Sequence, residues 1–356
     1  MKIIDLFSGI GGFALGFQRA GYQFTEHYFS EIDKHAIANY KYNFPHAKYI
    51  GDITTLHGGD FTDIDIITFG SPCQNFSTAG KREGLAGVKS SLIKYAIALI
   101  ANIRPSVFIW ENVKGAFSSN AGADFWAILQ AFTHIGGYRL EWQLLNTSWL
   151  LPQNRERIYL VGHLAGRSIP GVFPFGENDK LLDRKTREKG WRGRNFKTSL
   201  ARTITARYSK MGSYDTYIVP KVAATLTGGG HSGGLHSDMT VIRQLKRGKN
   251  KGADLTICPT ISSNAFQENN LLNGVRRLTE IECERLQGFP DNWTQYGDYN
   301  GKIRRISKTQ RYKLIGNAVT VDIVELIAKR LKFIVDENNT RTRPTYPRVG
   351  KRKGDI

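Results

Sequence analysis

Short β-rich runs alternate with amphipathic or apolar helical patterns along the first 165 residues, and this alternation limits the fold more than any other feature of the sequence. Strands that alternate with helices predict a mostly parallel sheet with helices on both faces, which is an α/β fold. Ligands of such sheets bind beyond the carboxyl ends of the strands. The expected strands are residues 2–7, 26–30, 47–50, 64–69, 106–110, 139–146 and 157–162, and the expected helices are 13–20, 34–42, 91–102 and 124–135.

The sequence changes character after about residue 165. Up to about residue 273 it is rich in Gly, Ser, Thr, Lys and Arg, with short β-like runs and no long helical pattern. We expect either a separate loop-rich domain or an irregular insertion. Helical patterns then return: Thr279 and Glu282 predict a capping box, and Gly288 predicts the helix end. A final helix over 319–333 is apolar on most faces, so it should pack on the first domain and make that domain discontinuous.

The charge balance narrows the class of partner. Lys and Arg total 50 against 31 Asp and Glu, a formal net charge of +19. Such an excess favours a polyanionic partner, most commonly nucleic acid, although a basic protein without such a partner stays an alternative. Eleven Lys and Arg but only two acids lie between Lys180 and Lys210. Residues 336–356 form a basic tail that we expect to be disordered.

Cysteine usage and hydropathy exclude several other classes. The three cysteines are scattered, which argues against a disulfide framework and for a reducing, cytoplasmic location. No Cys and His spacing indicates a structural zinc site, so we expect no metal. No apolar run approaches the roughly 18 residues of a membrane span, so we expect no membrane contact.

A glycine-rich turn follows the first expected strand, in the sequence DLFSGIGGF at positions 5–13. Gly9, Gly11 and Gly12 allow a sharp turn and a close approach to a ligand. Dinucleotide folds use a related pattern to seat a pyrophosphate, but the spacing here fits that pattern imperfectly. A site for S-adenosylmethionine (AdoMet) or a purely structural turn are the alternatives.

Two acidic residues follow the next expected strands, each beside an aliphatic residue. Glu31 precedes Ile32, and Asp52 precedes Ile53. A carboxylate at such a strand end can bind the two hydroxyls of a ribose, and the aliphatic neighbour can pack on a flat adenine. Glu31 could instead complement the dipole of the following helix. Two such pairs on successive strands make a nucleoside pocket the better interpretation.

Cys73 lies directly after an expected buried strand, in the sequence GSPCQNFSTAG. Pro72 stiffens the turn, and a thiolate with a lowered pKa is a strong nucleophile. Small and polar residues up to Lys89 are typical of a mobile lid. Alone, Cys73 would more simply be a half-buried thiol with no role.

Two further strand ends carry polar groups. Glu111 ends a strongly apolar strand, where a carboxyl can keep its proton and act as an acid, or form an ordinary ion pair. Arg155 and Arg157 are two residues apart, so in a strand they share a face. That face could hold a carbonyl or phosphate group, although a surface phosphate contact or an ordinary ion pair would also explain either arginine.

Together these motifs resemble the bacterial and phage DNA cytosine-5 methyltransferase family over about residues 1–165 and 275–335. The Pro-Cys-Gln, Glu-Asn-Val and Gln-x-Arg-x-Arg elements are highly specific in this order. In order, the motifs are DLFSGIGGF (5–13), SEID (30–33), GDIT (51–54), GSPCQ (70–74), WENV (110–113), QNRERIY (153–159), RRLTEIECERLQGFP (276–290) and LIGNAV (314–319).

The resemblance implies a Rossmann-like catalytic domain, formed by 1–165 and 313–335. It also implies a smaller, loop-rich target-recognition domain at 166–312, with a variable part at about 166–275 and a hinge region at 276–312. The implied reaction transfers a methyl group from AdoMet to C5 of a flipped-out cytosine in duplex DNA and leaves S-adenosylhomocysteine.

The resemblance also implies a role for each candidate site residue. Cys73 would attack C6 of the cytosine, Glu111 would protonate N3, and Arg157, supported by Arg155, would contact O2. AdoMet would be held by Phe7, Gly9, Ile10, Gly12, Glu31, Ile32, Asp52, Ile53, Pro72, Leu92, Asn317 and Val319. The candidate DNA-binding residues are Gln74, Ser77, Arg192, Arg194, Arg202, Arg207 and Arg243. We expect a monomer that acts on double-stranded DNA, as a phage or orphan enzyme or beside a cognate restriction endonuclease.

Three alternatives stay open. A tRNA methyltransferase with the same motif order is the nearest, but such relatives have little recognition domain. A non-catalytic DNA-binding relative usually lacks the Cys or the Glu, and both are present here. A nicotinamide dehydrogenase would need a better glycine pattern and gives no role to Pro72-Cys73-Gln74.

Overall fold

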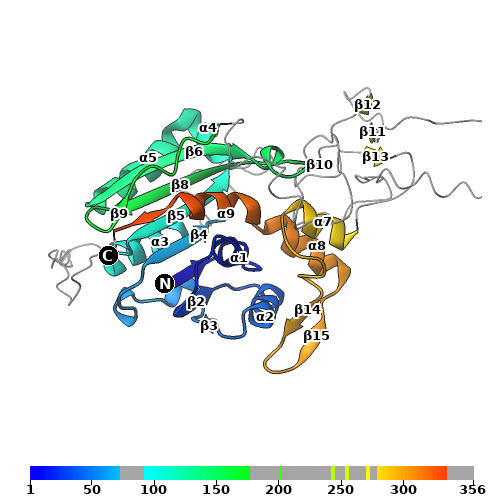
Figure 1. Ribbon diagram of the computed structural model, residues 1–356, viewed down its shortest axis with the longest axis horizontal. Coiled ribbons are helices and arrows are strands. Elements are labelled where there is room, and N and C mark those ends of the chain that lie inside the picture. Colours follow the sequence, from blue (N-terminus) through cyan, green and yellow to red (C-terminus); the bar gives the residue numbers. More distant parts are fainter. Residues whose placement is uncertain are drawn as a thin grey trace, which may run out of the picture.

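A seven-stranded sheet forms the centre of the protein. A computed structural model describes residues 1–72, 92–176 and 279–334, together with the backbone of four short strands between positions 201 and 272. The strand order is β3-β2-β1-β4-β5-β8-β6, and every neighbouring pair is parallel except those of β8, which is antiparallel to β5 and β6 (Figure 1). These strands are β1 (Lys2–Leu6), β2 (Glu26–Ser30), β3 (Lys48–Tyr49), β4 (Ile66–Gly70), β5 (Val107–Val113), β6 (Tyr138–Asn146) and β8 (Glu156–Leu164). The prediction of a mostly parallel sheet is confirmed.

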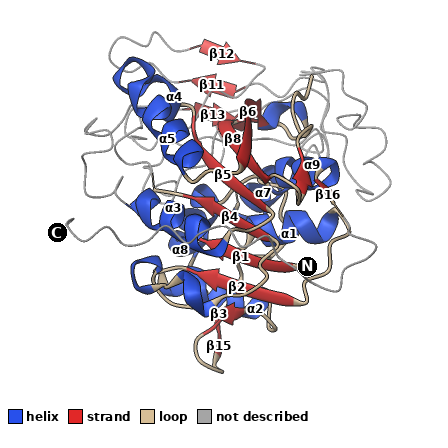
Figure 2. Ribbon diagram, turned by 90° about the vertical axis from the view of Figure 1, so that its left-hand side faces the viewer, coloured by secondary structure: helices blue, strands red, loops and turns tan. Residues whose placement is uncertain are grey.

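Helices cover both faces of this sheet (Figure 2). Residues of one strand alternate between the faces: Ile3 joins the core cluster with α1 and α9, whereas Ile4 joins the cluster with α3 and α5. Because both faces are covered, the inner strands are apolar at nearly every position. The helices are α1 (Gly12–Arg19), α2 (Lys34–Asn43), α3 (Leu92–Ile103), α4 (Gly115–Ser118), α5 (Ala123–His134), α7 (Glu280–Leu286), α8 (Lys308–Asn317) and α9 (Val321–Arg330).

Short elements complete the described chain. The short strands are β7 (Gln153–Asn154), β9 (Ser168–Ile169), β10 (Ala201–Arg202), β11 (Ile242–Gln244), β12 (Ala253–Leu255), β13 (Asn270–Leu272), β14 (Tyr296–Asp298), β15 (Ile303–Arg305) and β16 (Lys332–Phe333). Single turns of 3-10 helix are Ile53–Thr55, Gly58–Asp60, Ser119–Gly122 and Thr147–Trp149. No helix of the described ranges is both long and apolar enough to cross a bilayer.

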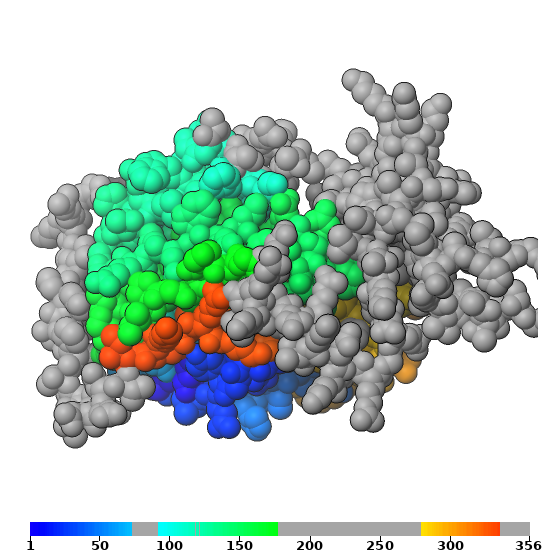
Figure 3. Space-filling view, turned by 45° about the horizontal axis from the view of Figure 1, so that its top comes forward, coloured from blue at the N-terminus to red at the C-terminus, as the bar shows by residue number. Residues whose placement is uncertain are grey.

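The C-terminal helix α9 returns to the N-terminal helix α1. In Figure 3 the orange C-terminal segment lies between the blue N-terminal region and the green region near residues 150–176. A Cβ atom at Gly16 would lie 2.5 Å from Cγ1 of Val324, so only glycine permits this close approach. The expectation that the last helix packs on the first domain is therefore confirmed.

The expected extent of that last helix was wrong. We expected a helix over 319–333, but α9 ends at Arg330. Lys332 and Phe333 instead form β16, which is antiparallel to β9. The strand β9 pairs with β16, and Val172 and Phe175 belong to the same core cluster as residues of β1, α1 and α9.

The segment from 279 to 312 begins with the expected capping box. The Thr279 side chain accepts from the backbone N–H of Glu282, and the Glu282 side chain accepts from that of Thr279, so two unpaired donors are satisfied. Gly288 lies beyond the helix end with φ +81°, the left-handed conformation that glycine adopts readily. Both signals were present in the sequence, and the structure confirms them.

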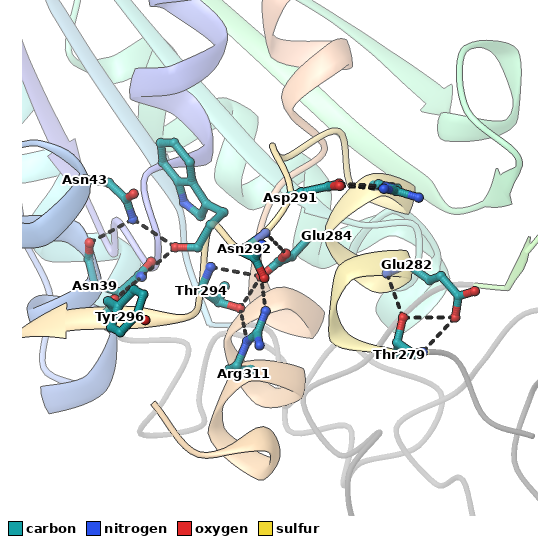
Figure 4. A network of polar contacts seen from close by, with 12 residues as sticks. Asn39, Asn43, Thr279, Glu282, Glu284, Asp291, Asn292, Thr294, Tyr296 and Arg311 are labelled. Atoms are coloured by element: carbon teal, nitrogen blue, oxygen red, sulfur yellow. Dashed lines mark hydrogen bonds and ion pairs between the residues drawn. The ribbon is translucent and has the colours of Figure 1, made fainter. Parts of the chain in front are cut away.

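A buried ion pair organises the chain between α7 and α8 (Figure 4). Glu284 is fully buried, and its Oε1 lies 2.9 Å from Nη2 of Arg311. The same carboxylate accepts from the backbone N–H of Asn292 at 2.7 Å and of Thr294 at 2.9 Å, and from the Thr294 hydroxyl. The donors come from Asn292 and Thr294 in the loop and from Arg311 of α8, so this one carboxylate ties the loop after α7 to α8.

Candidate active site

A carboxylate and a guanidinium meet at the carboxyl end of β5. Glu111 lies beside Gly70 of β4 on one side and Tyr159 of β8 on the other. Arg157 lies opposite Val113 in the antiparallel pair, so its side chain reaches diagonally along the same face as Glu111. Arg157 Nε is 3.1 Å from Glu111 Oε1.

Burial sets the electrostatics of this pair. The Glu111 side chain is 11% exposed and that of Arg157 is 15% exposed. Burial raises the pKa of the Glu111 carboxyl above its ordinary value, while the positive charges of Arg157 and Arg155 act in the opposite direction. A carboxyl in this balance takes up a proton more readily than a surface glutamate and can donate a hydrogen bond to a ligand.

Gly70 leaves the space in which this carboxyl lies. A Cβ atom at this position would be 3.1 Å from Glu111 Oε2. The chain continues from Gly70 into Ser71, whose hydroxyl accepts from Trp110 Nε1 at 3.1 Å. The exit from β4 is thereby attached to β5 just before the position of Cys73.

Arg155 makes a contact that the sequence did not predict. It is 3% exposed, and its Nη2 donates to the carbonyl oxygen of Ala318 at 2.7 Å. Burial lowers the pKa of the Arg155 guanidinium to about 9, and the charge of Arg157 adds to that shift. Arg155 thus connects the Glu111–Arg157 pair with the turn between α8 and α9, which carries Asn317 and Val319.

A second group of expected residues gathers where β1 and β2 end. Glu31 Oε2 accepts from the backbone N–H of Gly9 at 2.9 Å, and Oε1 accepts from that of Ile32 at 2.8 Å. The Ile32 side chain is 73% exposed, which is unusual for an isoleucine and leaves a flat apolar surface beside the carboxylate. Oε1 also accepts from the backbone N–H of Asp33 at 3.0 Å, so it is Oε2 that keeps a second lone pair for a ligand.

The backbone of the glycine-rich turn adopts the left-handed conformations that its glycines allow. Phe7, Gly9 and Gly11 have φ values of +50°, +54° and +82°. A Cβ at Gly12 would lie 2.6 Å from Cγ2 of Val319, so the start of α1 and the turn after α8 touch. Residues from opposite ends of the chain therefore meet at this turn.

The match to a known family extends over nearly the entire chain. The family model of the C-5 cytosine-specific DNA methylases matches residues 1–333. The chain belongs to this family. It is a DNA cytosine-5 methyltransferase that uses AdoMet, as the resemblance implied.

Curated relatives of this methyltransferase are similar over nearly their whole length. Type II methyltransferase M.NgoBI of Neisseria gonorrhoeae is 32% identical, with 92% of each chain covered. Type II methyltransferase M.HaeII of Haemophilus aegyptius is 31% identical, over 98% of this chain and 97% of that protein. The solved structure of the Schizosaccharomyces pombe Dnmt2 methyltransferase has a TM-score of 0.53 at 19% identity, covers 92% of this chain and 96% of its own, and is similar in fold.

The residues present fit AdoMet. Glu31 presents carboxylate oxygens beside the exposed face of Ile32, which suits a ribose next to a flat purine. Asp52 caps the short 3-10 turn by accepting from the backbone N–H of Thr54 at 3.1 Å, so its carboxylate is held at the third strand end. Asn317 is exposed at the end of α8, and Pro72 and Leu92 are partly exposed.

Three aliphatic residues of the expected AdoMet set, Ile10, Ile53 and Val319, are core residues in this methyltransferase, and the first two are the more deeply buried. Ile10 is fully buried, and its carbonyl oxygen accepts from Trp293 Nε1 at 2.9 Å. Ile53 is 3% exposed and packs with the apolar face of β4. Neither side chain presents surface to a ligand here, so each would act by shaping the neighbouring backbone.

Several expected residues lie outside the described part of the chain. Cys73, Gln74, Ser77, Arg192, Arg194 and Arg207 have no described position, nor has the basic tail 336–356. Arg202 and Arg243 are described by their backbone alone, in β10 and β11. The backbone of β10 is parallel to β7, so this part of the chain reaches the strand that leads to Arg155.

One buried acid was missed by the sequence reasoning. Asp5 of β1 is fully buried, with Oδ1 accepting from the Thr68 hydroxyl at 2.9 Å and Oδ2 from the Tyr40 hydroxyl at 3.1 Å. Burial raises its pKa to about 8. An acid inside the apolar run KIIDLF was the available signal. In the described ranges, no three His, Cys, Asp or Glu side chains group to hold a metal ion.

Proposed function

We propose that Glu111, Arg157 and Cys73 form the catalytic centre of this DNA methyltransferase. The observation that carries the proposal is the buried Glu111–Arg157 pair at the carboxyl edge of the sheet. Only three peptide bonds separate Cys73 from Gly70, the neighbour of Glu111. The Cα atoms of Cys73 and Gly70 are therefore at most roughly 11 Å apart.

The thiolate of Cys73 adds to C6 of the target cytosine, and Glu111 donates a proton to N3, so that no negative charge accumulates on the ring. Arg157 binds the O2 carbonyl. The addition makes C5 nucleophilic, and AdoMet, when bound, supplies the electrophilic methyl group. Loss of the C5 proton to a base then expels the Cys73 thiolate, and the N3 proton returns to the Glu111 carboxylate, which restores the aromatic ring.

Arg155 acts as a support in this proposal. Its guanidinium is buried and donates to the Ala318 carbonyl, so it holds the turn with Asn317 and Val319 near the catalytic pair. Glu31, Ile32 and the Gly9 turn hold the AdoMet nucleoside from the other side. The two groups together place the methyl donor beside the base.

The target base has to leave the duplex, because stacked neighbours shield C6 from attack above the ring plane. The basic chain between Lys180 and Lys210, with Arg192, Arg194, Arg202 and Arg207 as candidates, contacts the DNA and reads its sequence, together with Arg243 further along the chain. The enzyme works as a monomer. It methylates those sites of the host DNA that a cognate restriction endonuclease would otherwise cut, as the names of the Type II relatives suggest.

Bisulfite sequencing of a plasmid from cells that express the chain tests this function and maps the target site. We expect one cytosine of a short sequence to be fully methylated, and no methylation with Cys73→Ser. Transfer of tritium from labelled AdoMet to duplex DNA and to tRNA is the parallel assay. Label found only in tRNA would refute the DNA assignment.

A covalent trap tests the nucleophile. Duplex DNA that carries 5-fluorodeoxycytidine at the mapped site cannot lose a proton from C5, so Cys73 should stay attached to the base. We expect an adduct on a denaturing gel with the wild type and none with Cys73→Ser. Absence of the adduct from an active wild-type enzyme would contradict the proposed attack at C6.

A further inference from the structure

A rigid β-hairpin, residues 296–305, projects from the segment between α7 and α8. Its strands β14 and β15 are antiparallel, and Asn300 and Gly301 at the turn have φ values of +55° and +83°. Two consecutive residues in this conformation form the tight turn that matches the twist of a hairpin. Tyr299 N–H donates to the Lys302 carbonyl at 3.0 Å, and the Asp298 carboxylate accepts from Gly301 N–H at 2.6 Å.

The hairpin is fixed on α2. Asn39 Nδ2 donates to the carbonyl oxygen of Tyr296 at 2.8 Å, and the Tyr299 hydroxyl is 2.6 Å from Nδ1 of His35. A Cβ at Gly297 would lie 2.9 Å from that of Ala38, so strand and helix are in direct contact. His35 is in the first turn of α2, just after Glu31. The turn of the hairpin therefore lies at the same edge of the sheet as the AdoMet site.

The hairpin and the residues after it carry a dense positive charge. Lys302, Arg304, Arg305 and Lys308 are all exposed. Within the described part of the chain, none of the four forms an ion pair. Arg305 lies over the Tyr296 ring, with its guanidinium carbon 5.9 Å from the ring centroid.

The acids of the same segment are already engaged. Asp291 pairs with Arg285, and Asp298 holds the hairpin turn. The four cations are consequently not neutralised by their own neighbourhood. Exposed like charges on one short element repel each other only weakly in water, but together they create a positive potential that attracts a polyanion.

We infer that this hairpin is an additional DNA-binding arm that contacts phosphates beside the target site. The inference rests on the proposed action on duplex DNA and adds a surface outside the basic region 180–210. The hairpin lies on the same side of the molecule as α7 and α8, to the right in Figure 1, where the carboxyl ends of the parallel strands also point. A rigid arm positions its cations at little entropic cost, which suits contacts that fix the register of a duplex.

The test compares Lys302→Gln/Arg304→Gln with the wild type in binding assays over a range of salt concentrations. Each phosphate contact contributes about 0.9 to the slope of log K against log salt, so we expect the slope to fall by about 1–2. Affinity at low salt should fall about 10-fold. Lys302→Glu/Arg304→Glu should produce a larger loss in the same direction. Thermal unfolding and AdoMet affinity should not change.

Duplex length locates the contact. On a duplex that extends about 10 base pairs beyond the mapped site, the hairpin variant should show its full loss of affinity. On a duplex that ends at the site, the variant and the wild type should bind equally. Arg139→Gln/Arg167→Gln is the matched control, because it removes the same charge near the amino end of β5, at the opposite edge of the sheet. It should leave the slope unchanged.

The outcomes separate the two proposals. A wild type that neither methylates nor binds DNA overturns the proposed function. If the wild type methylates DNA but the hairpin variant has the same slope of log K against log salt as the wild type, only the hairpin inference is overturned. An equal loss in the hairpin variant and in the control shows a general charge effect, which also overturns it.

Discussion

Two buried carboxylates, Glu111 and Glu284, each lie beside an arginine, but their surroundings differ. Glu284 accepts hydrogen bonds from Arg311, from two backbone N–H groups and from a hydroxyl. Glu111 contacts only Arg157 among the described residues, and burial raises its pKa. A carboxylate with all its lone pairs occupied is a structural anchor, whereas one with a single donor keeps the capacity to hold a proton and bind a ligand.

We therefore expect Glu284 to contribute to stability and Glu111 to contribute to the reaction. The C-terminal segment uses its buried pair to hold a loop against α2 and α8. The sheet edge keeps a less satisfied pair next to the site where the cytosine is expected. Four substitutions test whether this division is correct, beginning with the largest expected effect.

Glu111→Gln should reduce methyl transfer by about 10²–10⁴-fold, because an amide of the same shape cannot supply a proton to N3. The free energy of unfolding should change little, since a carboxyl with a raised pKa contributes little stability when ionised at neutral pH. Single-turnover methyl transfer and chemical denaturation measure the two effects. Full activity in Glu111→Gln would remove Glu111 from the catalytic centre.

Glu284→Gln should destabilise the protein by about 3–5 kcal/mol, because it leaves the buried Arg311 without a counter-charge. Urea denaturation measures the loss. Glu282→Gln is the matched control on the same helix, where the amide oxygen can still accept from Thr279 N–H, so the loss should be below about 1 kcal/mol. Equal stabilities for the two variants would break the distinction between anchor and reactive carboxyl.

Asp5→Asn adds a third buried carboxyl to the comparison. The pKa of Asp5 is raised from an ordinary 3.8 to about 8, so its contribution to stability is complete below pH 4 and is lost as the pH rises to 8. Asparagine does not titrate, so the variant should gain stability relative to the wild type across that window, on the order of a few kcal/mol at pH 8. Thermal unfolding at several pH values measures this, and a difference that stays constant with pH would show that Asp5 is not the titrating group.

Glu31→Ala should weaken AdoMet binding by about 1–3 kcal/mol, because the ribose hydroxyls and the Gly9 N–H lose an acceptor. Glu26→Ala, at the start of the strand β2 that Glu31 follows, is the matched control and should bind AdoMet normally. Titration calorimetry measures both. Unchanged affinity in Glu31→Ala would exclude this carboxylate from the cofactor site.

Much of the fold was predictable, because local patterns determine the strands and helices of the first 165 residues. The strand Glu26–Ser30 appears with the expected bounds, and the capping box at Thr279 is confirmed. The prediction of a helix over 319–333 was wrong at its C-terminal end, because Lys332 and Phe333 pair with β9, a partner more than 150 residues away. No local signal reports such a partner.

The places of the candidate site residues at strand ends were predictable, but their contacts were not. The positions of Glu111 and Arg157 followed from strand ends, yet the donation from Arg155 to Ala318 depends on how the C-terminal turn packs. The hairpin at 296–305 was not predicted although Asn300-Gly301 is a strong turn signal, because its two strands are only three residues long and carry no clear alternation of apolar and polar residues. The Glu284–Arg311 pair spans 27 residues and has no periodic signature.

The close contact of Gly16 with Val324 has a consequence for synthesis on the ribosome. The apolar side of α1 has no cover until α9, near the end of the chain, has emerged. A nascent polypeptide that lacks those last residues exposes Phe13 and Phe17 to water and cannot complete its core. Translation therefore has to pass through the whole chain up to Arg330 before the glycine-rich turn at the start of α1 gains its packing partner.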